Sequence, residues 1–259
     1  MTLSDRELEE LRAARAMLEK PSFIARVSNT MGAPVEQTLK VLPGPLARRV
    51  GELTESVVRS AFDSALYTLR DPRPEASWDR AHKLAAMGSG ALGGAFGLAA
   101  LALELPVSTG IMLRSIADIA RSEGEDLRAP ETKVQCIQVL ALGGPSAGDD
   151  AAETGYFAAR AGLAKAVTDA AKYLAAHQVG AQGAPAIVRL LSLVASRFSV
   201  VVSQKAAAQS VPLVGAFGGA TINALFIDHY QDMARGHFTV RRLERKHGAE
   251  AVRAAYAAL

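Results

Sequence analysis

Apolar residues recur at helical spacing along almost the whole chain. After Leu46, the residues Val50, Leu53 and Val57 fall on one side of a helix, and charged residues occupy the opposite side. This period of three to four residues is typical of an amphipathic helix packed on a core. The strongest strand-like run, residues 198–202, lies inside a longer helical pattern. Because one strand cannot form a sheet, the sequence predicts an all-α fold.

Capping residues and prolines indicate where the helices begin and end. Ser4 and Glu7 have the spacing of a capping box, in which each side chain binds the other residue's backbone amide. The prolines at 72 and 74 exclude a helix interior, so the sequence predicts an N-terminal helical region (1–70) and a helical core (77–259) in one continuous domain. Later helices are expected to begin at Pro106, Pro185 and Pro212. The last of these is expected to end near Arg235, with a new segment from Thr239.

Two uncharged stretches, residues 84–103 and 206–227, are long enough to cross a bilayer. Alanine and glycine dominate both, and alanine contributes almost nothing to membrane insertion. Their spaced glycines permit close contact between backbones, so we expect a buried, Gly/Ala-rich central helical hairpin. Membrane spanning and reversible surface insertion are the alternatives.

The composition excludes several classes of protein. Among 259 residues, 29 are basic and 26 acidic, with a net charge of +3 and 49% hydrophobic residues, which excludes wholesale disorder. The single cysteine, Cys136, excludes an internal disulfide and multi-cysteine metal sites. The five histidines include no pair at i, i+4, and no phosphate-binding glycine loop is present, so we expect no metal and no cofactor. The polar, charged first turn argues against a secretory signal and for a cytoplasmic protein.

Several charged residues interrupt the apolar segments. Arg114, Asp118 and Arg121 share one face of the helix expected after Pro106, whose first half is apolar all round and therefore expected to be buried. We predict an Arg114–Asp118 ion pair, with an anionic ligand at Arg114 or Arg121 as the alternative. Glu104 is expected to cap this helix, and a catalytic carboxylate is the alternative.

Ser146 lies in a G-x-S-x-G pattern, residues 144–148, that occurs in the nucleophile elbow of α/β-hydrolases. That elbow requires a sheet, which this sequence does not predict. We therefore interpret the pattern as a turn between helices and keep hydrolysis as an alternative function, without assigning a catalytic residue.

A basic run near the C-terminus is a candidate for binding a membrane surface. Its cations are Arg241, Arg242, Arg245 and Lys246. Aromatic residues are not interleaved with them, which argues against nucleic acid. Apolar residues at 238, 240 and 243 supply a second face, so an anionic membrane surface fits better. The alternative is a solvated helix face with Glu244 paired internally.

Longer motifs resemble the EcsC family over residues 80–258, and less clearly over the first 70. They are ELPVST at 104–109, MLRSIADIAR at 112–121, GED at 124–126, ET at 131–132 with Cys136, LGG at 142–144, QK at 204–205, VP at 211–212, the glycines of 215–219, Asn223, HF at 237–238 and LER at 243–245. The family is named after a bacterial operon that also encodes an ATP-binding cassette transporter. The resemblance implies an envelope or transport context and no assigned reaction.

The motif blocks contain the candidate ligand-binding residues Glu104, Arg114, Asp118, Arg121, Lys205 and Asn223. Lys205 is predicted to pair with Glu104 or Asp118. We expect a non-enzymatic accessory protein, cytoplasmic or peripheral on the inner membrane, that binds a lipid-like or apolar ligand. Its expected partners are an anionic membrane surface or envelope transport machinery. The alternatives are a hydrolase using Ser146 or the polar cluster around Glu104, and a structural interaction module.

Overall fold

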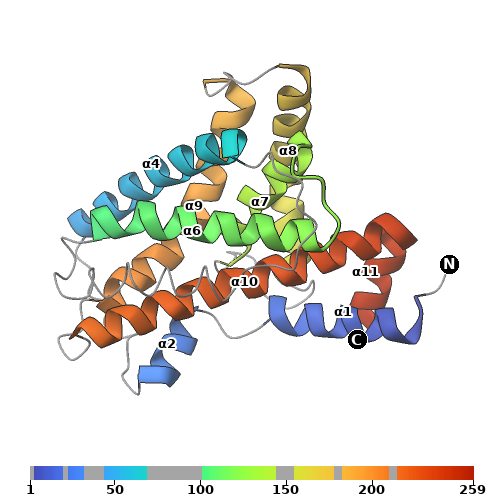
Figure 1. The fold of residues 1–259 in the computed structure, drawn as a ribbon, viewed down its shortest axis with the longest axis horizontal. Coiled ribbons are helices and arrows are strands. Elements are labelled where there is room, and N and C mark those ends of the chain that lie inside the picture. Colours follow the sequence, from blue (N-terminus) through green and yellow to red (C-terminus); the bar gives the residue numbers. More distant parts are fainter. Residues whose placement is uncertain are drawn as a thin grey trace.

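The computed structural model describes residues 3–19, 23–31, 44–68, 101–143, 155–177, 183–209 and 215–259. Within these ranges all regular secondary structure is α-helical, which confirms the predicted all-α fold (Figure 1). The helices are α1 (Asp5–Leu18), α2 (Phe23–Met31), α4 (Gly44–Thr68), α6 (Leu101–Ser122), α7 (Pro130–Leu142), α8 (Gly155–Ala176), α9 (Pro185–Gln209), α10 (Gly215–His247) and α11 (Ala249–Ala258).

Local sequence explains several helix ends. At the start of α1, the Ser4 amide donates to Glu7 Oε2 over 2.9 Å and the Glu7 amide donates to Ser4 Oγ over 3.4 Å, which is the predicted capping box. Helix α9 begins at Pro185, as predicted. The strand-like residues 198–202 lie inside α9, where Phe198, Val201 and Val202 pack in the core.

Two predicted boundaries are wrong. Helix α6 begins at Leu101, so Pro106 lies inside it. Pro106 is the sixth residue of α6 and removes one intrahelical hydrogen bond, the one that a backbone amide at this position would donate to the carbonyl of residue 102. Helix α10 continues through the break predicted between Arg235 and Thr239. Burial of His237 and Phe238 offsets the low helix propensity of Gly236, and α10 ends only before Gly248, which has a φ of 89°.

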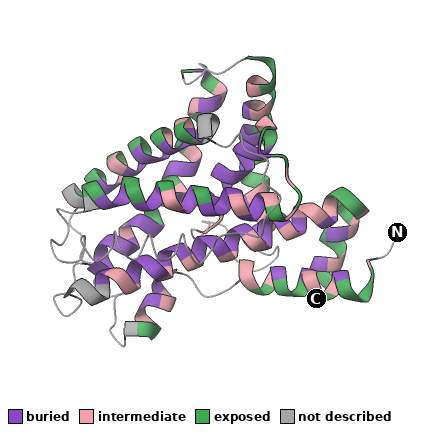
Figure 2. Cartoon of the chain, in the orientation of Figure 1, coloured by how far each residue is buried: buried purple, intermediate pink, exposed green. Residues whose placement is uncertain are grey.

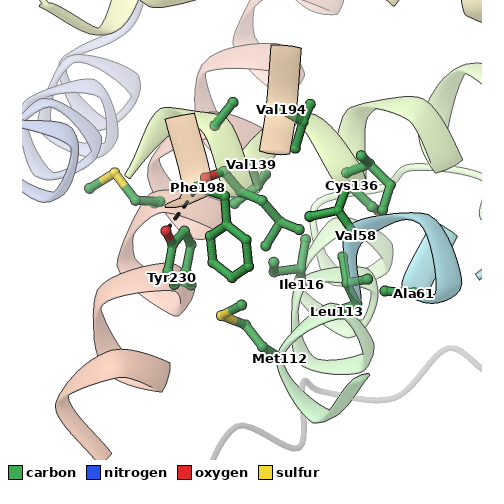
Figure 3. Close-up of a cluster of buried hydrophobic side chains, with 14 of the residues drawn as sticks. Val58, Ala61, Met112, Leu113, Ile116, Cys136, Val139, Val194, Phe198 and Tyr230 are labelled. Carbon is green, nitrogen blue, oxygen red and sulfur yellow. Dashed lines mark hydrogen bonds between the residues drawn. The ribbon is translucent and has the colours of Figure 1, made fainter. Parts of the chain in front are cut away.

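The long helix α10 runs through most of the molecule, with α6 beside it and α4 beyond α6 (Figure 1). Helices α4 and α6 run in the same direction, and α1 and α11 lie together near the C-terminal end of α10. The larger hydrophobic core joins α2, α4, α6, α7, α8, α9 and α10. Figure 3 shows part of it, in which Phe198 and Tyr230 face Met112 and Ile116. A smaller core joins α1 and α11 to α10 and the start of α8.

The predicted central hairpin falls largely outside the described residues, which include only 101–103 of the first uncharged stretch. Of the second stretch, the described residues Ala206, Ala207 and Ala208 are completely buried at the end of α9, as is Ile222 in α10. Among the described helices, α9 is the one long and apolar enough to cross a membrane, and 44% of its most apolar window is buried in the protein.

Candidate functional site at the amino-terminal end of α6

The first turn of α6 carries a buried ion pair with α9. The Lys205 ammonium lies 2.6 Å from Glu104 Oε1, and the two side chains are 0% and 3% exposed. Of the two partners that the sequence suggests for Lys205, the structure therefore has Glu104. The expectation that Glu104 caps the helix is wrong, because α6 begins three residues earlier. The carboxylate is nevertheless in the first turn, where the helix dipole favours a negative charge.

Gln209, Ser108 and the aromatic ring of Phe226 surround the Glu104–Lys205 pair and complete the cluster. The Gln209 side-chain amide donates to Glu104 Oε2 over 2.8 Å, so both carboxylate oxygens accept a hydrogen bond. The Lys205 ammonium is also 3.4 Å from Ser108 Oγ and 4.5 Å from the centre of the Phe226 ring on α10. This cation–π contact adds to the stabilisation of a desolvated charge. The cluster thus connects α6, α9 and α10.

Burial and pairing act on Lys205 in opposite directions. Removal from water lowers the pKa of the Lys205 ammonium, and the adjacent Glu104 carboxylate opposes that shift. A buried pair of this kind adds little net stability compared with apolar residues, but loss of one partner leaves a stranded charge. The cluster therefore joins the first turns of α6 to α9 through side chains, whereas α4, α7 and α10 pack against both helices.

The sequence suggested neither Ser108 nor Gln209 as members of this cluster. A signal was present, since Glu104 and Ser108 are four residues apart and so are Lys205 and Gln209, which places each pair on one side of its helix. Which side of α6 faces Lys205 is decided only in the folded protein, by the packing of α6 and α9 on α4, α7 and α10. Asn223 is completely buried in α10, three residues before Phe226 and on a similar side of that helix.

The predicted pair between Arg114 and Asp118 is wrong. Arg114 is exposed, and Asp118 Oδ1 lies 3.4 Å from Arg121 Nη2 instead. The spacing of three residues between Asp118 and Arg121 brings these groups together as readily as a spacing of four. Arg114, Asp118 and Arg121 lie ten or more residues beyond Glu104 in α6, about 15 Å or more along the helix axis, so the six candidate ligand-binding residues do not converge on one site.

The outer side of α6 is apolar at its amino-terminal end. Leu103 is 79% exposed and Val107 is 51% exposed, so the expectation that this half of the helix is buried all round is wrong. Figure 2 shows exposed positions recurring along α6. From 102 to 114 the exposed residues are Ala102, Leu103, Pro106, Val107, Gly110 and Arg114. Glu104, the one acidic residue in this stretch, is on the inner side.

The basic run near the C-terminus of α10 is paired with acidic side chains. Arg241 binds Glu125 over 2.8 Å and Glu131 over 3.0 Å, and Arg245 also pairs with Glu125. These contacts join the end of α10 to the turn between α6 and α7 and to the first turn of α7.

Two cations of the same run contact α1. Arg242 pairs with Glu10 over 2.9 Å as well as with Glu123, and Lys246 pairs with Glu7 over 2.7 Å. Much of the positive charge proposed for membrane contact is therefore balanced within the protein. A surface role for this run stays a prediction.

Comparison with models of known protein families shows to which family this chain belongs. A family model described as the EcsC protein family matches residues 5–243 of the 259-residue chain. The chain belongs to the EcsC family. The match reaches further towards the N-terminus than the resemblance over residues 80–258, and it includes α1, α2 and α4. No curated protein and no solved structure matches the chain.

Other candidate chemistry in this EcsC-family protein is limited. Ser146 lies outside the described residues. Cys136 is completely buried, and burial raises the pKa of its thiol, which disfavours the reactive thiolate. Within the described part of the chain, no three His, Cys, Asp or Glu residues are grouped to hold a metal ion. A surface hollow of about 450 Å³ lies beside Arg241, Glu244 and Arg245, and charged residues make up much of its lining.

Proposed function

We propose that this EcsC-family protein is a non-enzymatic accessory protein that associates peripherally with a membrane. The observation that carries the proposal is the exposure of Leu103 and Val107, one turn apart on α6. Transfer of a large aliphatic side chain from water to an apolar environment is favourable by about 1.5–3 kcal/mol. Two such side chains support reversible binding to a bilayer surface. The lipid-like ligand expected from the sequence is then the bilayer itself.

The geometry favours a peripheral position for α6. Its inner side packs on the core through residues such as Met112 and Ile116, both of which are completely buried. Only the outer side is available to lipid, and the exposed Arg114 follows Val107 by two turns. A helix with one apolar side and a charge at that distance is suited to the bilayer interface. We place the protein in the cytoplasm, on the inner face of the membrane, with envelope transport machinery as its protein partner.

The buried cluster supports a positioning role in place of catalysis. Both oxygens of Glu104 are engaged, and its side chain is only 3% exposed. A substrate would have to separate the helices around this buried cluster to reach it. We therefore assign Glu104 and Lys205 to holding α6 in the orientation that exposes Leu103 and Val107.

Vesicle flotation tests the proposal. The wild-type protein is expected to float with phospholipid vesicles, and Leu103→Ser combined with Val107→Ser is expected to abolish flotation without lowering the melting temperature. Val200→Ser is the matched control, because Val200 is 38% exposed on α9 and has polar residues three and four positions away on both sides. Wild-type protein that stays with the soluble fraction would contradict the proposal and favour a structural interaction module.

Hydrolysis by the cluster around Glu104 is a second candidate function. The specific observation is that Ser108 Oγ lies 3.4 Å from an amine whose pKa is lowered by burial. In this function Lys205 first passes a proton to Glu104 and then, as a neutral amine, acts as general base for the Ser108 hydroxyl. This function predicts that Ser108→Ala removes activity towards a generic ester or amide substrate. Equal turnover by wild type and variant would argue against it.

A further inference from the structure

The outer side of α6 points to a particular lipid partner. We infer that α6 docks with its amino-terminal end on anionic lipid, with Leu103 and Val107 entering the acyl region and Arg114 binding the lipid headgroups. This inference rests on the proposed membrane association and adds to it the lipid class and the orientation of the helix.

Four residues on the exposed side of α6 are aligned along the helix. Leu103, Val107, Gly110 and Arg114 are spaced at i, i+4, i+7 and i+11, so they form one line along the exposed side of α6. At a rise of 1.5 Å per residue, Arg114 lies about 10 Å further along the helix than Val107. Interfacial helices bury their apolar side by roughly 5–10 Å at the headgroup boundary. An α6 inclined with its amino-terminal end towards the bilayer therefore brings the Arg114 guanidinium to headgroup level.

The exposed side of α6 carries a positive charge and no negative charge between residues 102 and 114. Glu104 is turned inward and paired with Lys205, so the exposed positions from 102 to 114 carry no negative charge. The next acidic residue along the helix is Asp118, whose side chain is 16% exposed and paired with Arg121. Arg114 is therefore the exposed charge of this stretch. The adjacent α4 carries exposed residues of both signs near its start, and so does not decide the lipid preference.

A folded protein is the alternative partner for the exposed side of α6. A stable protein interface buries about 800 Å² on each partner and concentrates its energy in Trp, Tyr and Arg residues. Among the described positions of α6, the large apolar side chains that are exposed are Leu103 and Val107, close to Pro106 and Gly110. A Cβ at Gly110 would meet nothing within 4 Å, which indicates open space beside the helix. A small aliphatic surface followed by a cation suits lipid better than a folded partner.

Binding to two kinds of vesicle tests the inference. Wild-type protein is titrated with phosphatidylcholine vesicles that either contain or lack phosphatidylserine. We expect tighter binding to the anionic vesicles, weakened by added salt, because salt screens the attraction of Arg114 for the surface. Arg114→Gln is expected to weaken binding to anionic vesicles by about fivefold, the usual contribution of one basic residue near such a surface, and to leave binding to neutral vesicles unchanged.

Arg128→Gln provides a matched control, since the Arg128 side chain is 66% exposed but pairs with Asp126 in the turn beyond α6. It is expected to bind like wild type. Equal binding of wild type to both vesicles, or of Arg114→Gln and wild type to anionic vesicles, would overturn the inference. The proposed function survives that result if Leu103→Ser with Val107→Ser still abolishes binding. Failure of the wild type to bind either vesicle would contradict both.

Discussion

Lys205 shows how one residue depends on the contacts around it. Its side chain is completely buried, yet it ends in a charge that water would otherwise solvate. Glu104, Ser108 and the ring of Phe226 take the place of that water. The sequence allowed two acidic partners for Lys205, and only the arrangement of α6 and α9 in the folded protein selected Glu104.

Replacement of Lys205 by methionine is expected to lower the free energy of unfolding by about 3–5 kcal/mol, because Glu104 then stays buried without a counter-charge. The double variant Lys205→Met with Glu104→Gln should recover much of that loss, since no buried charge remains. Thermal or denaturant unfolding measures both.

Lys165→Met is the control for this prediction, because the Lys165–Asp169 pair is exposed and contributes at most about 1 kcal/mol. Equal loss of stability in Lys165→Met and Lys205→Met would show that burial of the Glu104 pair has no energetic consequence.

The contact between α1 and α10 illustrates the scale of whole elements. Gly236 lies in the middle of α10, and a Cβ there would lie 2.6 Å from Leu18 Cγ and 3.0 Å from the backbone oxygen of Ala14. The sequence suggested a break after Arg235, near this glycine, whereas the structure uses it for close approach of two helices. The sequence alone does not distinguish a glycine that ends a helix from a glycine that lets another helix come close. The distinction requires knowing which helix packs beside it.

Gly236→Ala is expected to destabilise the protein by about 1–3 kcal/mol, because the added methyl forces α1 away from α10. Amide hydrogen exchange should also become faster in α1 than in the wild type.

Gly162→Ala provides the opposite case, since a Cβ at this exposed position of α8 would meet nothing within 4 Å. This variant should be stabilised by about 0.5–1 kcal/mol through helix propensity. A stabilised Gly236→Ala would contradict the close packing of α1 on α10.

Buried histidines affect the stability of the whole molecule. His229 donates from Nε2 to the Gly143 carbonyl over 2.8 Å, and burial lowers its pKa to about 4. His237 lies between the Tyr156 hydroxyl and Gln135 Oε1, each 3.0 Å away, and burial holds its pKa well below 6.5. Both rings are therefore neutral in the folded protein, and they connect α10 with α7 and α8.

The unfolding free energy is expected to rise between pH 4 and about 6.5 and then to level off. In this window the unfolded chain binds protons at His229 and His237 while the folded protein does not, so acid favours unfolding, by at most about 1.4 kcal/mol per pH unit for each histidine. Denaturant unfolding at several pH values measures the slope.

His229→Gln retains an amide donor for Gly143 and should reduce that slope. Below about pH 4.5 a further loss is expected, because His247 and Lys246 lower the pKa of Glu7 in the folded protein, so that acid protonates this carboxylate first in the unfolded chain. An unchanged slope in His229→Gln would exclude this histidine as a source of the pH dependence.

The sequence alone determined the helical class, the capping box of α1, the start of α9 and the availability of Glu104 as a partner for Lys205. These follow from local spacing, capping and composition, which act between residues close in the chain. The tertiary structure decided that Asp118 pairs with Arg121, that Glu104 turns inward, that Leu103 and Val107 face outward, and that the basic end of α10 is balanced by α1 and the turn after α6. Each of these depends on which side of one helix meets another, and that is set by packing between residues far apart in the sequence.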